Sequence, residues 1–182
     1  LSAAEKGFLV SLPILAGAFL RFPLGILSQY IGRKNAALVE MALVFIGLLY
    51  GFFFVKTLSD VHIMSVILGI AGASFGIAMA LGAGWFPPEK KGLAMGVVGA
   101  GNSGSILVLL FAPPLAMRIG WQNVYGVAAA MMFIPWLVML IIAKEPPDVT
   151  HQSFKDHVKC LWEKDGWVFN LSYMITFGGF IG

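Results

Sequence analysis

Arg21 is the residue with the clearest potential for chemistry, because it is the only charged residue in the apolar segment 7–31. Helical geometry places it roughly 15–20 Å from either end of that segment, near the midplane of a hydrocarbon core about 30 Å thick. A charge at this depth costs at least about 2.5 kcal/mol, so such residues usually face the protein interior and pair with a partner. The planar guanidinium fork matches the oxygens of a planar anion. The sequence therefore predicts an anion site within a membrane.

The run at residues 99–105 (GAGNSGS) is a second candidate. Glycines can interrupt a helix and expose backbone N–H groups, which bind anions, and the amide of Asn102 can donate to an oxyanion. A packing role, in which Asn102 hydrogen-bonds a neighbouring helix, explains the same residues equally well. For the longer stripes of small residues, packing against another helix is the favoured explanation. These stripes are Gly72, Gly76, Ala80 and Gly84, and Gly92, Gly96, Ala100 and Gly104.

The composition predicts the helices that would position these residues. The chain is 59% hydrophobic and 12% charged, with a mean hydropathy of +0.87, whereas a soluble domain carries about 25% charged residues. Five apolar segments are each long enough for a membrane helix, and a sixth begins at Trp167. We therefore expect an all-α polytopic membrane protein. The five segments are 7–31, 36–55, 62–86, 92–117 and 124–143.

Basic residues between the spans predict the orientation. Eight lie on one side and three on the other, so the richer side is cytoplasmic and residue 1 is on the outer side of a cell inner membrane or plasma membrane. A chain that starts outside predicts a further helix before Leu1, and the sixth span is too short to cross. We therefore expect a fragment of a larger protein. The two sets are Arg33, Lys34, Lys90, Lys91, Lys144, Lys155, Lys159 and Lys164, against Lys6, Lys56 and Arg118.

Three regions follow from this pattern. Residues 1–143 form a helix bundle, residues 144–165 a cytoplasmic linker, and residues 166–182 the start of a second bundle. Within the linker, an i, i+4, i+7, i+8 pattern predicts an amphipathic helix on the inner membrane surface, built from Phe154, Val158, Leu161 and Trp162. A six-helix half followed by a linker is typical of transporters with two repeated halves.

Other functional classes find little support. The net charge of +3 is explained by loops between membrane spans, not by a nucleic-acid partner. A single cysteine, Cys160, excludes an internal disulfide framework and a multi-cysteine metal site. No nucleophile–base pair, phosphate loop or metal cluster occurs in the spans, so we expect neither an enzyme nor a cofactor.

Four motifs together resemble one transporter family. Residues 25–34 (GILSQYIGRK) resemble the loop motif between helices two and three of the major facilitator superfamily. Residues 92–104 (GLAMGVVGAGNSG) look like the signature of the nitrate/nitrite porter family within it. Residues 21–25 (RFPLG) are similar to that family's substrate-arginine segment, and residues 173–178 (YMITFG) to its helix-seven aromatic pair. The resemblance covers the whole chain, as about half of a twelve-helix family member.

The resemblance implies a site for nitrate or nitrite between two halves of a transporter. Arg21 would hold the anion, and a partner arginine is expected from the missing C-terminal half. Glycine backbone and an amide would line the site, and aromatic side chains would form its walls. These further residues are Phe75, Gly99, Gly101, Asn102, Gly104, Tyr173 and Phe177. The bilayer is the other partner.

The loop motif implies a cytoplasmic gate, formed by Gly25, Gln29, Gly32, Arg33 and Lys34. Gln29 stands where the superfamily usually has an acidic residue, and Tyr30 where it has a basic one. Gln29 cannot form the ion pair that helps to latch the gate. Glu40 could replace it, although pairing with loop charges near the inner surface is the role we expect.

The sequence thus predicts nitrate and nitrite transport by alternating access. Apart from Glu40, the complete spans contain no acidic residue, and their only histidine, His62, lies at an outer end. Proton-coupled transporters commonly carry such groups in the pathway, so exchange is favoured over proton-coupled symport. Transport of another small anion, such as formate or a carboxylate, and a non-transporting anion sensor remain alternatives. The sequence does not separate nitrate from nitrite.

Overall fold

A computed structural model describes residues 2–147 and 162–181, with side chains up to residue 176 in the second stretch. The described residues form α-helices and short 3₁₀ turns, and the all-α prediction is confirmed. The predicted amphipathic helix rests on Phe154, Val158 and Leu161, which lie outside the described residues. The helices are α1 (Ala3–Ile31), α2 (Arg33–Phe53), α3 (Leu58–Ala83), α4 (Lys91–Gly99), α5 (Gly104–Ile119), α6 (Trp121–Ile142) and α8 (Lys164–Ile181), with turns η1 (Pro88–Lys90) and η2 (Ala100–Ser103).

Five segments are long and apolar enough to cross a membrane. They are α1, α2, α3, the combined segment Pro88–Ile119 and α6, and each overlaps one of the five predicted apolar spans. Large apolar side chains face outward, including Leu109 at 74% and Ile141 at 78% exposure. Such a surface suits a hydrocarbon solvent, in which helices satisfy their own backbone hydrogen bonds.

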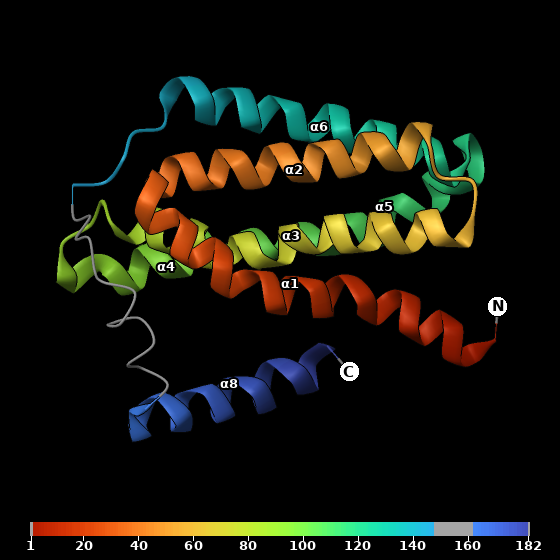
Figure 1. Ribbon diagram of the computed structural model, residues 1–182. Helices are drawn as coiled ribbons and strands as arrows, with labels where there is room; N and C mark the ends of the chain where they lie inside the picture. Colours follow the sequence, from red (N-terminus) through yellow and green to blue (C-terminus); the bar gives the residue numbers. More distant parts are fainter. Residues whose placement is uncertain (1, 148–161, 182) are drawn as a thin grey trace. The chain divides into compact units, whose positions relative to one another are not determined.

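The chain divides into two compact units, Leu1–Val149 and Thr150–Gly182. In the first unit α2 packs between α3 and α6, and α1 lies along α3 (Figure 1). Glycines permit the close packing around α2, because a Cβ on Gly51 would lie 2.6 Å from the sulfur of Met64, and one on Gly126 would lie 2.9 Å from the ring of Phe52. Of the second unit, the structure describes the single long helix α8.

Helix ends follow from local sequence. Capping boxes begin α1, through Ser2 and Glu5, and α3, through Thr57 and Asp60, and each satisfies backbone N–H groups at the helix start. Gly32, with φ +87°, is the single residue between α1 and α2. A residue with a side chain would be strained at that φ, which explains why the loop motif has a glycine there.

α1 crosses α3 at a close backbone approach. A Cβ on Gly17 would lie 2.7 Å from the carbonyl oxygen of Gly69, and one on Gly69 would lie 2.6 Å from the Cβ of Ala16. The first predicted glycine stripe takes part only at its end, where a Cβ on Gly72 would lie 3.6 Å from the Cα of Gly17. A Cβ on Gly76 would meet nothing within 4 Å. The packing role thus belongs to Gly17 and Gly69, which the stripe did not include.

Candidate functional site

The guanidinium of Arg21 joins α1 to α3. Its Nη2 donates a hydrogen bond of 3.0 Å to the backbone carbonyl oxygen of Gly72, 51 residues later in the chain. A helical carbonyl has a second lone pair available after its bond within the helix. Gly72 and Gly76 lie one turn apart on α3, and neither has a side chain that would cover this carbonyl. The bond therefore ties a charged side chain of α1 directly to the backbone of α3.

The remaining donors of Arg21 are not used by the described residues. Its Nε is buried and has no hydrogen-bond partner within the part of the chain that the structure describes. Leaving a buried donor unsatisfied costs about 1–3 kcal/mol. A guanidinium has five N–H donors in a planar fork, so one bond to Gly72 leaves an edge that can bind two oxygens.

The glycine-rich run forms the short turn η2 between α4 and α5. Its backbone tightens into a 3₁₀ turn and does not unwind, and the amides of Ala100 and Gly104 donate to preceding carbonyls. The predicted exposed backbone N–H groups are therefore not free at these two residues. The side chain of Asn102 is exposed and hydrogen-bonds no described residue, while its backbone oxygen accepts a 2.6 Å bond from Ser105 Oγ.

The second glycine stripe faces open space in the described structure. A Cβ placed on any of its glycines, or on Gly99 or Gly101, would meet nothing within 4 Å. The stripe glycines are Gly92, Gly96 and Gly104. The predicted packing of this stripe against another helix is therefore not found among the described residues, and the whole face is available to a ligand or a further helix.

The predicted aromatic walls are only partly described. Phe75 is half-buried on α3, three residues after Gly72, so the two residues share one face of the helix. Tyr173 is 46% exposed on α8 in the second unit, and the side chain of Phe177 lies outside the described residues. The structure thus brings Arg21 together with the Gly72 face of α3. It gives no geometry between that face and the second unit.

The loop motif is tied to the end of α6. The carboxylate of Glu145 accepts hydrogen bonds from the backbone amides of Arg33, at 2.6 Å, and Lys34, at 2.9 Å. The Arg33 guanidinium donates to the carbonyl of Ala80, and Lys34 Nζ to that of Leu140. A carboxylate on the first N–H groups of a helix is favoured by hydrogen bonding and by the helix dipole. Glu145 therefore caps α2 in place of a side chain from Gly32.

Sequence reasoning did not identify Glu145 as part of this cluster. A signal was available, because Glu145 follows the fifth apolar span on the same predicted side as Arg33 and Lys34. An acidic residue on the same side of the membrane as basic residues can pair with them. The partner it takes, a helix N-terminus, depends on how α6 packs against α2.

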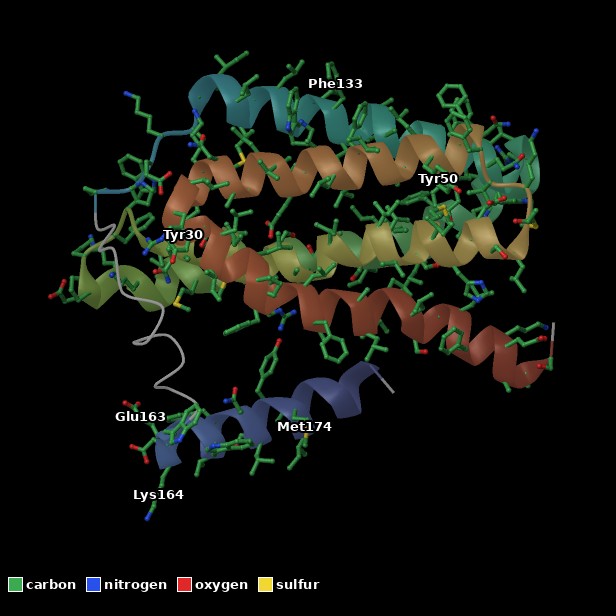
Figure 2. All side chains as sticks on the ribbon, in the orientation of Figure 1. Tyr30, Tyr50, Phe133, Glu163, Lys164 and Met174 are labelled. Carbon is green, nitrogen blue, oxygen red and sulfur yellow. The ribbon has the colours of Figure 1, made fainter. Side chains whose placement is uncertain are left out.

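The other residues of the loop motif make fewer hydrogen bonds and close contacts with the described residues. Gln29 Oε1 is buried without a hydrogen-bond partner among the described residues, and a Cβ on Gly25 would meet nothing within 4 Å. Figure 2 shows Tyr30 at the end of the bundle where α1 meets α2, with Tyr50 toward the other end of α2. Glu40 was expected to pair with loop charges, but both of its carboxylate oxygens are buried without a hydrogen-bond partner in the described part.

Comparisons with known proteins agree with this architecture. The chain is 29% identical over a 185-residue alignment to the nitrite extrusion protein of Bacillus subtilis (strain 168), covering 100% of this chain and 46% of the relative. It is 31% identical over 151 residues to the probable nitrate transporter NarT of Staphylococcus carnosus, covering 80% of this chain and 38% of the relative. No solved structure matches significantly.

These relatives are longer than the chain, which spans less than half of their length. The family model for the Major Facilitator Superfamily matches residues 1–182. This match extends over every span described above, and it describes membrane transporters, not enzymes. The chain belongs to the major facilitator superfamily.

Proposed function

We propose that this chain forms the anion-binding part of a transporter that moves nitrate and nitrite across a membrane by alternating access. The observation that carries the proposal is Arg21, a charged residue deep in a membrane span, with one donor on Gly72 and its Nε buried and unpartnered. A planar oxyanion would bind the N–H donors of Nη1 and Nη2 that no described residue uses, and would offset the cost of a charge within the span. The printed names of the relatives, nitrite extrusion protein and nitrate transporter, support this class of substrate.

The proposed site extends from Arg21 to the open glycine face. The side chain of Asn102 and the backbone at Gly99, Gly101 and Gly104 would line it, because a Cβ on these glycines meets no described residue. Phe75 would pack on the flat face of the anion. Tyr173 and Phe177 would be further aromatic contacts of the anion, as the resemblance of residues 173–178 implies.

The proposed gate lies at the end of the bundle that holds Arg33, Lys34 and Glu145. These residues join the turn after α1 to the end of α6, so both ends would move together when the pathway opens. The excess of basic residues favours placing this end at the cytoplasm, with the linker 144–165 on the same side. Because Gln29 lacks a charge, the gate would rely on the Glu145 contacts more than on an ion pair from the motif.

The decisive experiment is uptake of isotopic nitrate into proteoliposomes that contain the product of the complete gene. We expect uptake to be strongly stimulated by internal nitrite, since exchange requires a counter-anion. Empty liposomes and an Arg21→Lys variant are the controls. Uptake driven by an inward proton gradient without internal nitrite would instead indicate symport. Stronger competition by formate than by nitrite would indicate another anion, and binding without turnover would indicate a sensor.

A further inference from the structure

Glu40 is buried more completely than any other ionisable side chain described. It lies in α2 with 1% of its surface exposed. Neither of its carboxylate oxygens has a hydrogen-bond partner among the described residues. Ala36 and Ala37, about one turn earlier, are also buried and join Ile77 of α3 in the apolar core. Glu40 thus points into the interior of the half-bundle, away from the surface where a solvated carboxylate would be stable.

An ionised carboxylate in such a place is very unfavourable. An isolated buried charge costs several kcal/mol even after the protein relaxes, unless a cation pairs with it. The nearby cations of its own helix are used elsewhere, because the Arg33 guanidinium donates to Ala80 and Lys34 Nζ to Leu140. A neutral carboxylic acid avoids the charge penalty and supplies its own donor. The geometry therefore favours the protonated form of Glu40.

A cavity of about 600 Å³ lies beside Glu40, between α2, α3, α4 and α6. α3 contributes Ser74 to its lining, α4 contributes only apolar Val98, and Lys144, just after α6, is the single other ionisable group. No residue of α1 lines it. The cavity is roomy enough for a side chain to move, and Lys144 is among the residues that line it.

The position of Lys144 is coupled to the loop motif. Its neighbour in the chain, Glu145, holds the backbone amides of Arg33 and Lys34 at the start of α2. Any movement of α6 against α2 that strains this cap also displaces Lys144 relative to the cavity.

A small-molecule amine bound to Glu40 is a weaker explanation of the cavity. The Glu40 carboxylate oxygens are covered, so no ligand in the cavity could contact them without a rearrangement.

We propose that Glu40 is a proton-binding site that controls the conformation of this half-bundle. In the conformation described, the carboxyl holds a proton and the Lys144 side chain remains at the rim of the cavity. On rearrangement the O–H bond breaks, the proton passes to water at the membrane surface, and the Glu40 carboxylate forms an ion pair with the Lys144 ammonium inside the cavity. This site is separate from Arg21 and goes beyond the proposed anion transport.

The direct test is difference infrared spectroscopy of the purified full gene product during a pH titration. We expect a carbonyl-stretch band from a protonated carboxyl at neutral pH, and expect Glu40→Gln to remove it. Lys144→Met should shift the loss of the band to higher pH, because the ion pair that favours deprotonation is absent. Glu89→Gln, an exposed carboxyl on η1, should change nothing. A wild-type spectrum without this band at neutral pH would overturn the proposal.

A second measurement addresses the control of conformation. The pH dependence of the maximal uptake rate should disappear in Glu40→Gln, whose amide imitates the neutral acid, and should be kept in Glu89→Gln. An unchanged pH profile in a well-folded Glu40→Gln protein would contradict the controlling role. The infrared titration needs no transport, so it distinguishes failure of the proton site from failure of the proposed nitrate function.

Discussion

The Nη2 atom of Arg21 lies 3.0 Å from the backbone oxygen of Gly72. This bond fixes the guanidinium against α3 and leaves its Nε buried without a described partner. Charged residues within membrane spans pair with one another or with backbone carbonyls, and Arg21 takes the second kind of partner. The contact holds one side of the guanidinium against α3 and leaves it a free edge.

Substitution of Arg21 by lysine tests that free edge. Lysine keeps the positive charge but loses the planar fork, so it cannot bond the Gly72 carbonyl and two anion oxygens in the same geometry. Nitrate affinity should fall at least about tenfold, equivalent to roughly 1.4 kcal/mol. Calorimetric titration of the purified full-length protein measures this. Arg118→Lys, an exposed arginine in the last turn of α5, is the matched control, and wild-type affinity in Arg21→Lys would rule out a bidentate site.

Gly101→Leu tests the open glycine face. A Cβ at this position meets nothing within 4 Å, so the described bundle should fold and insert normally. A branched side chain would still project into the space where we place the anion and a facing helix. We expect loss of transport from a monodisperse protein. Gly7→Leu, also in open space but at the start of α1, should transport normally, and equal activity of both variants would make the glycine motif incidental.

Gly69→Ala tests the crossing of α1 and α3. The added Cβ would lie 2.6 Å from the Cβ of Ala16 and 2.8 Å from the backbone oxygen of Pro13. Backbone atoms cannot move aside as a flexible side chain can, so overpacking should destabilise the protein by about 1–3 kcal/mol. Thermal unfolding in detergent should show a lower midpoint. Gly76→Ala on the same helix meets no atom within 4 Å, so it should keep or slightly raise the midpoint, because alanine favours a helix interior over glycine.

Glu145→Ala tests the cap on α2. The substitution removes the acceptor for the backbone amides of Arg33 and Lys34, which should cost about 0.5–2 kcal/mol, as for other helix N-caps. We expect a lower unfolding midpoint and an altered balance between inward- and outward-open states, measured by accessibility of a single introduced cysteine. The exposed Glu89 provides the control substitution Glu89→Ala. A variant with unchanged midpoint and unchanged accessibility would show that the cap is dispensable.

The membrane spans could be predicted from the sequence because hydropathy is a local property. Each apolar stretch must be helical in lipid, since only a helix satisfies its own backbone, and the five segments found agree with the predicted ones. Gly32 was likewise part of the loop motif identified in the sequence. The physical reason for a glycine there, a φ of +87° between two helices, became visible only in the structure.

Partners across helices could not be predicted in this way. The bond of Arg21 to Gly72, the cap formed by Glu145 and the isolation of Glu40 each depend on the rotation and depth at which helices pack. Local sequence does not determine the rotation and depth at which helices pack. A stripe of four small residues permits close packing, but it does not specify which helix packs against it.

The sequence by itself determined the membrane-spanning segments and showed that one of them carries a charged residue, Arg21, far from both of its ends. The tertiary structure alone decided which backbone carbonyl binds Arg21, and that Gly17 and Gly69 lie where α1 crosses α3. The physical reason is that burial in lipid is set by composition along one chain segment. Hydrogen bonds and close contacts are set by distances of a few ångströms between segments far apart in that chain.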